Sequence, residues 1–162
     1  MLSVTAENMS RIMESYGDML YRICLIMLKN ETDAEDAVQE SFIAYMKKTQ
    51  QFQSDEHEKA WLIRVATNKC RDIMRFRKRN ETVSDELIEN YMSDEESTEV
   101  VETLMLLPEK IRIVMLLHYV EGYKVEEIAK IIGKTQSAVK MRLAKGRKLF
   151  EESYRKEYLN EN

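Results

Sequence analysis

A short helical pattern and a longer one, separated by a turn with one glycine, lie in the stretch VEEIAKIIGKTQSAVKMRLAKGRKLF (residues 125–150), which is the strongest indication of the fold. Apolar side chains recur at helical spacing over residues 125–132, and Gly133 suits the left-handed backbone that often ends a helix. Thr135 is a favourable N-cap for a second helix, which we expect to continue to about Tyr158. A short helix, a turn containing glycine and a second helix form the helix-turn-helix pattern.

The second helix of this pattern has an apolar side and a basic side. Its inward residues are expected to be Val139, Leu143, Gly146 and Phe150. The residues expected to face a nucleic acid are Gln136, Ser137, Lys140, Met141, Arg142, Ala144, Lys145, Arg147 and Lys148. Such a helix suits the major groove, because its side chains can reach base edges while its flanks neutralise phosphates. A helical hairpin in any all-helical protein can mimic the pattern, so that alternative stays open.

Three more helices are predicted upstream of residue 81. Apolar residues at helical spacing from Met9 to Met27 predict one long amphipathic helix. A second is expected over DAEDAVQESFIAYMKK (residues 33–48), capped by Thr32 or Asp33. A third is expected from about Glu58 to Lys78. The side chains of the last two helices that are expected to face the core are Ala37, Val38, Phe42, Tyr45, Trp61, Leu62, Val65, Ala66, Ile73 and Met74.

Glycine and proline, on which sheets and tight turns depend, are scarce, with 4 and 1 among 162 residues. The composition therefore favours an all-α fold. We expect two small helical domains, residues 1–80 and 100–162, joined by an acidic linker, residues 81–99. A helix from Pro108 to Glu121 is expected to precede the helix-turn-helix. A short capped helix around residues 87–92 is the alternative to an irregular linker.

The formal net charge of −4 conceals two compact basic blocks. Residues 59–80 carry eight Lys or Arg side chains against Asp72 alone, and residues 134–148 carry six and no acid. Residues 81–102, in contrast, carry nine acids and no base. Each basic block is a possible footprint for a phosphate backbone, because local fields steer such partners more than net charge does. A basic run on a helix is, however, more often a solvated face than a nucleic-acid site. Two such blocks make a nucleic-acid site more plausible but do not establish it.

No pattern for catalysis, a metal or a cofactor stands out. The chain lacks a glycine-rich phosphate loop and a nucleophile elbow, so we expect no enzyme activity and no cofactor. His118 lies in an apolar run and is expected to be a core or boundary histidine rather than a ligand, while the polar run 55–58 lacks the second histidine of a zinc site. Cys24 and Cys70 are expected to be small buried hydrophobes. Trp61 stays open between a core role and stacking on an unpaired base.

The sequence also lacks signals for membrane insertion or export. No apolar run approaches the ~20 residues that a bilayer crossing needs. The first residues show no basic-then-apolar signal pattern. We therefore expect a soluble, cytoplasmic protein.

Three segments, with the acidic stretch between the second and the third, resemble the extracytoplasmic-function sigma factors of bacterial RNA polymerase. They are DAEDAVQESF (33–42), KAWLIRVATNKCRDIMR (59–75) and LPEKIRIVMLLHYVEGYKVEEIAKIIGKTQSAVKMRLAKGRKLF (107–150). The resemblance covers roughly residues 8–155. It implies two helical domains, regions 2 and 4, in a non-enzymatic subunit that directs polymerase to specific promoters and initiates transcription. It further implies core RNA polymerase, promoter DNA and, in many members, an anti-sigma protein as partners.

The resemblance also implies roles for individual residues. The surface expected to dock on core polymerase consists of Asp33, Glu35, Asp36, Gln39, Glu40 and Phe42. The residues expected to capture and help open the −10 element are Trp61, Arg64, Asn68, Lys69, Arg71 and Arg75, with Asn68 near a pocket for a flipped base. The nine residues named above, from Gln136 to Lys148, are expected to face the −35 element. Met141 and Ala144 depart from the residues usual in the family, so a base preference does not carry over.

Two other classes of protein fit parts of the pattern. A stand-alone helix-turn-helix regulator would bind duplex DNA without polymerase, but it has no use for an acidic helix followed by a basic, aromatic one. A helical adaptor that binds only protein, such as an anti-sigma antagonist, is disfavoured by the two basic blocks. Measurements of DNA binding with and without core polymerase separate these possibilities.

Overall fold

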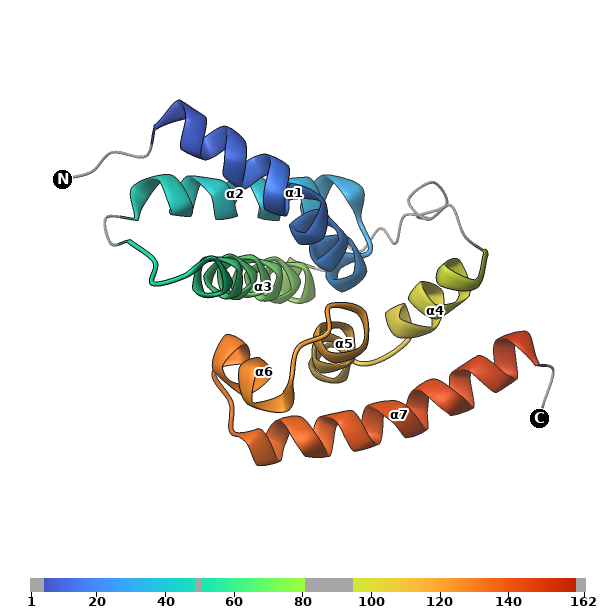
Figure 1. The fold of residues 1–162 in the computed structure, drawn as a ribbon. Coiled ribbons are helices and arrows are strands. Elements are labelled where there is room, and N and C mark those ends of the chain that lie inside the picture. Colours follow the sequence, from blue (N-terminus) through green and yellow to red (C-terminus); the bar gives the residue numbers. More distant parts are fainter. Residues whose placement is uncertain (1–4, 49–50, 81–94, 160–162) are drawn as a thin grey trace. The chain divides into compact units, whose positions relative to one another are not determined.

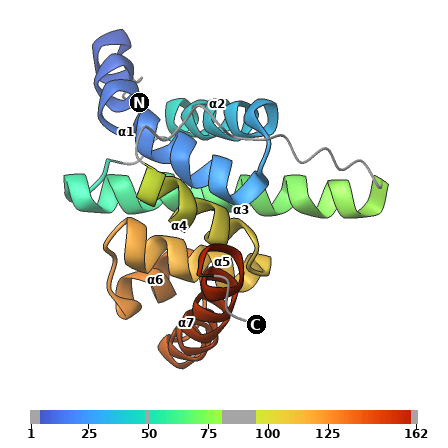
Figure 2. The same ribbon diagram turned by 90° about the vertical axis from the view of Figure 1, so that its right-hand side faces the viewer.

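The computed structural model describes residues 5–48, 51–80 and 95–159, and the chain divides into two compact units, Met1–Leu87 and Ile88–Asn162. All regular elements within the described ranges are helices (Figures 1 and 2). The predicted all-α fold with two helical domains is therefore confirmed. The alternative helix around residues 87–92 lies outside the described residues.

The first unit is a bundle of three helices, α1 (Ala6–Leu28), α2 (Glu31–Lys47) and α3 (Asp55–Asn80), each of which packs against the other two. The predicted long first helix is confirmed. Its hydroxyl cap is Thr5, which accepts a hydrogen bond from the Asn8 amide at 3.1 Å. Residues 23–28 are all buried, so this end of α1 is enclosed on every side and forms the centre of the core.

The corner between α1 and α2 differs from the predicted one. Asn30, rather than Thr32 or Asp33, caps α2, because its side-chain oxygen accepts a hydrogen bond from the Asp33 amide at 2.9 Å. Lys29 ends α1 in a left-handed conformation with φ of 58°. Because Lys29 already turns the chain, α2 begins at Glu31, two residues earlier than predicted.

The buried face of α3 is rotated from the predicted one. Its buried residues are Glu58, Leu62, Ile63, Ala66, Thr67 and Cys70, whereas Trp61, Val65, Ile73 and Met74 are half-buried. The latter four, predicted on the apolar stripe, therefore lie at the edge of the buried face rather than at its centre. The helix also begins at Asp55, three residues before the predicted start. The buried face of α3 includes the carboxylate of Glu58, so the spacing of apolar residues alone does not predict it.

The second unit contains α4 (Glu95–Met105), α5 (Glu109–Met115), α6 (Val125–Ile132) and α7 (Gln136–Tyr158). Gly133 ends α6 with φ of 68°, and the Thr135 hydroxyl caps α7 by accepting a hydrogen bond from the Ala138 amide at 3.1 Å. Both features of the predicted helix-turn-helix are confirmed. α4 begins at Glu95, so residues 95–99, predicted above as linker, are helical.

The helix predicted from Pro108 to Glu121 is not regular throughout. α5 is followed by a π-helical turn, η1 (Leu116–Val120), in which the Glu121 amide donates to the Leu116 carbonyl, five residues back, at 3.1 Å. All residues from 111 to 117 are buried. The wider turn accommodates one extra residue in this enclosed stretch.

Gly146 allows α7 to approach α5 closely. A Cβ atom built on it would lie 2.6 Å from Sδ and 2.7 Å from Cγ of Met115, and 3.0 Å from Cγ2 of Ile111. Both neighbouring side chains are buried. We expect Gly146→Ala to lower the free energy of unfolding by about 1 kcal/mol, because overpacking costs about 1–3 kcal/mol and alanine recovers about 1 kcal/mol of helix propensity.

Chemical denaturation of the full chain measures this effect, and Gly17 in α1 supplies the matched control. A Cβ atom on Gly17 meets nothing within 4 Å, so Gly17→Ala should instead stabilise the protein by about 1 kcal/mol. A Gly146→Ala protein as stable as the Gly17→Ala protein would mean that Met115 moves aside without cost.

Candidate nucleic-acid interface

The outward side of α7 is exposed and basic, opposite a buried stripe. Its exposed residues include Gln136, Ser137, Lys140, Met141, Ala144, Lys145, Arg147 and Lys148, and Arg142 is half-buried. Val139, Leu143 and Gly146 are buried as predicted, and Phe150 is half-buried. Across the described parts of the chain, Lys140, Lys145 and Lys148 form no ion pair. Their charges are therefore available to phosphates.

A tyrosine from the π-turn orients one of these cations. Nη1 of Arg147 donates to the hydroxyl of Tyr119 at 3.3 Å. The Tyr119 ring packs edge-on against His118, with ring centroids 4.8 Å apart, and Nδ1 of His118 donates to the Tyr123 carbonyl at 2.7 Å. His118 is thus a boundary histidine, as predicted. Its ring packs against the tyrosine that accepts a hydrogen bond from Arg147, a contact for which the sequence carried no signal.

Some of the basic residues of α3, which we call its basic stripe (Arg64, Lys69, Arg71 and Arg75), form ion pairs with neighbouring acids. Of its predicted DNA contacts, Arg64, Asn68 and Arg75 are exposed, and Trp61, Lys69 and Arg71 are half-buried. Lys69 pairs with Glu40 of α2 at 3.5 Å, and Arg75 pairs with Asp72 at 3.7 Å. Both pairs are solvent-exposed and worth at most about 1 kcal/mol, so a phosphate can displace either carboxylate.

An aromatic cluster lies where α2 ends and α3 begins. Tyr45 and Phe52 stack with ring centroids 5.8 Å apart, and Trp61 meets them edge-on at 6.2 Å and 5.5 Å. Nζ of Lys48 lies 4.8 Å from the centre of the Phe52 ring and 5.2 Å from that of Trp61. We call Tyr45, Phe52 and Trp61 the aromatic shelf. Because Trp61 is only half-buried, part of its ring surface stays open to a ligand.

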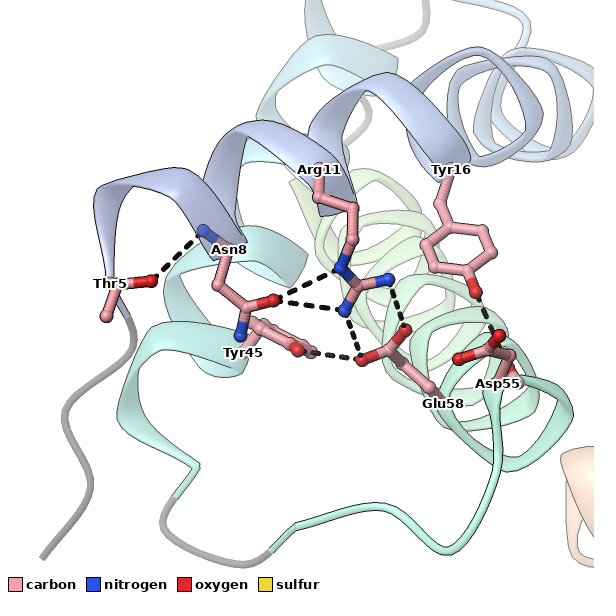
Figure 3. Close-up of polar contacts among 7 residues, drawn as sticks. All are labelled: Thr5, Asn8, Arg11, Tyr16, Tyr45, Asp55 and Glu58. Carbon is pink, nitrogen blue, oxygen red and sulfur yellow. Dashed lines mark hydrogen bonds and ion pairs between the residues drawn. The ribbon is translucent and has the colours of Figure 1, made fainter.

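A buried carboxylate lies beside this shelf, between α1 and α3 (Figure 3). Oε1 of Glu58 accepts a hydrogen bond from Nη1 of Arg11 at 3.3 Å. Oε2 accepts from Nη2 of Arg11 at 3.2 Å and from the Tyr45 hydroxyl at 2.8 Å. Burial, strengthened by the bond to Glu58, raises the pKa of Tyr45 to about 12, so its hydroxyl remains a donor at neutral pH.

The acidic surface of α2 is smaller than predicted. Glu35, Asp36, Gln39 and Glu40 are exposed. Asp33 instead pairs with Arg77 of α3, whose Nη1 also donates to the Leu28 carbonyl at 2.7 Å. Phe42 is only 8% exposed and belongs to the core. Asp33 is therefore only partly exposed, and Phe42 is buried, as its place in the apolar pattern predicted. The open part of the predicted docking surface consists of the other four residues.

Two exposed apolar side chains, Ile43 and Met46, complete that face of α2. They follow Gln39 at steps of four and three residues, which is the spacing of one helix face. This spacing could have predicted from the sequence that the two apolar residues share a face with the acids. The prediction missed it because it considered only the polar residues and Phe42. The face thus combines acids with apolar side chains, which suits a protein partner better than a nucleic acid.

The remaining residues singled out in the sequence have structural partners. Nδ1 of His57 accepts a hydrogen bond from the Gln53 amide at 3.4 Å, at the start of α3. Cys24 and Cys70 are buried as predicted, and a hydrogen bond between them, together with burial, raises the pKa of the Cys70 thiol. Within the described ranges, no group of His, Cys, Asp and Glu side chains is arranged to hold a metal. None of the described helices combines the length and hydropathy of a membrane span.

Both units match family models. Residues 12–81 match the model for sigma-70 region 2, and residues 97–150 match the model for sigma-70 region 4. Each match falls on one helical unit, and the second contains the helix-turn-helix with its basic helix. A chain that carries both regions in this order is a sigma factor of the sigma-70 class.

Individual relatives specify the type. The RNA polymerase sigma factor SigV of Bacillus subtilis is 31% identical over 144 residues, covering 86% of this chain and 87% of SigV. The ECF RNA polymerase sigma factor SigW of the same organism is 28% identical over 163 residues, covering 89% of this chain and 87% of SigW. The structure of CnrH, an RNA polymerase sigma factor of Cupriavidus metallidurans, in complex with the cytosolic domain of CnrY matches with a TM-score of 0.68 at 26% identity, covering 91% of this chain and 88% of that one.

The chain therefore belongs to the extracytoplasmic-function sigma factors, as its resemblance predicted. It acts with RNA polymerase in the initiation of transcription at promoters.

Proposed function

We propose that the two units divide promoter recognition between them. The second unit reads the −35 element with the exposed face of α7. The first unit docks on core polymerase through α2 and captures the −10 element through α3. The exposed basic face of α7, opposite its buried stripe, is the observation that carries this proposal. In this proposal the chain has no catalytic role of its own and works in the cytoplasm, where polymerase works.

On α7, side chains of two kinds serve different purposes. Lys140, Lys145 and Lys148 neutralise phosphates and fix the register of the helix on the duplex. Met141 is 72% exposed, so its apolar side chain extends far enough to contact a thymine methyl group in the major groove. Gln136 and Ser137, in the first turn, lie where helix-turn-helix proteins approach base edges.

On the first unit, the docking face and the −10 face are neighbours. The acids of α2 suit a basic surface on polymerase, and Ile43 and Met46 add apolar contact. The aromatic shelf suits an unpaired base, because every base has a face that can stack on an aromatic ring. Lys48 beside the shelf, and Arg64 on α3, supply the charge for the adjoining phosphates.

In vitro transcription with core polymerase on a library of promoter fragments tests the proposal as a whole. We expect starts that depend on the added chain and that share two upstream elements. Starts that share only one element, or none, would contradict the division between the two units.

Trp61→Ala should weaken binding of the holoenzyme to DNA with an unpaired −10 strand by about tenfold, because stacking on an aromatic ring contributes about 1–3 kcal/mol per base. Fluorescence anisotropy of a labelled fork-junction DNA measures the change. Phe76→Ala is the matched control, since Phe76 is an exposed aromatic residue of the same helix outside the shelf. Equal effects of the two substitutions would argue against stacking at Trp61.

We also propose that an anti-sigma protein controls this chain. CnrH, which is similar in fold and sequence, is known in complex with the cytosolic domain of CnrY. The same acidic and apolar face of α2 that suits polymerase would suit an antagonist. Competition between core polymerase and the antagonist for the tagged full chain tests this, and simultaneous binding of both would contradict a shared surface.

A further inference from the structure

The Glu58 carboxylate is buried although it is charged. It is only 4% exposed, and it lies on the core face of α3, one turn before Leu62. Both of its oxygens have partners, through the two contacts with Arg11 and the one with Tyr45 described above (Figure 3). A buried charge is tolerated only when it is paired in this way.

Arg11 is itself fixed on the opposite side. The side-chain oxygen of Asn8 accepts hydrogen bonds from Nε of Arg11 at 3.2 Å and from Nη2 at 3.1 Å. Asn8 and Arg11 belong to the first turns of α1, Tyr45 to the last turn of α2 and Glu58 to the first turn of α3. The carboxylate therefore joins all three helices of the unit at one end.

The ion pair is buried only on the side of Glu58, since the Arg11 side chain is 46% exposed. Such a pair adds little net stability, because desolvation of the carboxylate offsets most of the attraction. Its directional hydrogen bonds do, however, restrict geometry. The Tyr45 hydroxyl is bound to Glu58, and the Tyr45 ring stacks on Phe52 and meets Trp61 edge-on. The hydrogen bond to Glu58 therefore restricts the orientation of the Tyr45 ring, which contacts both other rings of the aromatic shelf.

We propose that Glu58 is a positioning residue for promoter opening: paired with Arg11, it binds the Tyr45 hydroxyl and so aligns the aromatic shelf for stacking on an unpaired base. The inference rests on the proposed function of the shelf. It assigns a role in DNA opening to three residues outside the basic stripe, namely Asn8, Arg11 and Glu58.

The test uses the full chain in holoenzyme and three substitutions. Tyr45→Phe removes one hydroxyl and leaves the ring, and Glu58→Gln removes the charge. Glu56→Gln is the matched control, since Glu56 lies in the same first turn of α3 but is exposed. The probes are fork-junction DNAs with an unpaired −10 strand, intact or with a single abasic site at each unpaired position in turn.

We expect Tyr45→Phe and Glu58→Gln to bind the intact probe about fivefold to tenfold more weakly, because the Tyr45 ring loses a hydrogen bond that fixes its orientation. Glu56→Gln should bind like the unaltered chain. On the probe whose abasic site removes the stacked base, all four proteins should bind alike. A merely structural role of Glu58 would weaken binding to every probe equally and lower core binding as well, and that result would overturn the proposal.

Trp61→Ala on the same probes separates the positioning role of Glu58 from the stacking role of the shelf. If Trp61→Ala binds all probes like the unaltered chain, the shelf does not stack on a base and the proposed function of this end fails. If Trp61→Ala shows the base-dependent loss while Tyr45→Phe and Glu58→Gln do not, only the positioning role fails. Should Glu58→Gln not fold, Tyr45→Phe alone carries the test, because it leaves the ion pair with Arg11 intact.

Discussion

Replacing Lys140 and Lys145 together by alanine should reduce transcription from a target promoter by about a hundredfold or more while core binding is unchanged. Each side chain that touches a base edge or a phosphate contributes about 1–3 kcal/mol to DNA affinity, and both lysines are exposed on α7. Neither lysine forms an ion pair with a carboxylate in the described parts of the chain. Their replacement therefore removes two positive charges that are both available to the DNA phosphates. Run-off transcription and holoenzyme gel filtration are the two measurements.

The matched control removes two other exposed lysines, Lys110 and Lys156, which lie outside the face of α7 between residues 136 and 148. It changes the net charge equally and should leave transcription nearly intact. In the Lys140→Ala, Lys145→Ala protein, the logarithmic salt dependence of promoter binding should also become shallower by about one unit for each phosphate that is no longer neutralised. Loss of core binding in that protein would mean that the two units have been assigned the wrong partners.

Replacing Asp36 and Glu40 by lysine should have the opposite effect to the α7 substitutions. Core binding should weaken at least about tenfold, while α7 is unaffected. Both carboxylates are exposed on α2, and like charges brought together across an interface cost several kcal/mol. Glu40→Lys also removes the partner of Lys69, which leaves a new positive charge beside an existing one. A titration of labelled core polymerase measures the affinity, and the defect should shrink at high salt because salt screens exposed charges.

Glu7 and Glu14, two exposed acids of α1, provide the comparison for this reversal. Their joint change to lysine alters the net charge equally on another helix. If it weakens core binding as much as the α2 variant does, polymerase responds to total charge rather than to a docking face on α2.

The helix-turn-helix could be predicted to within a residue because its signals are local. Gly133 and Thr135 each act on a helix end no more than three residues away. The shelf support could not be predicted in this way. Arg11 and Glu58 are 47 residues apart in the chain, and a buried acid in the first turn of a helix looks like an ordinary exposed one.

The same separation along the chain explains why the sequence does not reveal the partner of Asp33 on α2. Asp33 carries the charge of a docking residue, but its partner Arg77 lies 44 residues later in the chain. Phe42, in contrast, follows the local apolar spacing of the helix and lies in the core, as that spacing predicted. The π-turn at Leu116–Val120 could not be predicted for another reason, since apolar spacing does not distinguish a four-residue step from a five-residue step over a single turn.

The π-turn makes the position of Tyr119, and so its hydrogen bond with Arg147 of α7, sensitive to the number of residues in η1. Deleting one residue between Leu116 and Val120 would restore a regular helix and rotate Tyr119 by about 100° around its axis. Its hydroxyl would swing away and release the guanidinium of Arg147. A change of chain length at this point would therefore alter the surroundings of one exposed cation of α7 without substituting any residue of that helix.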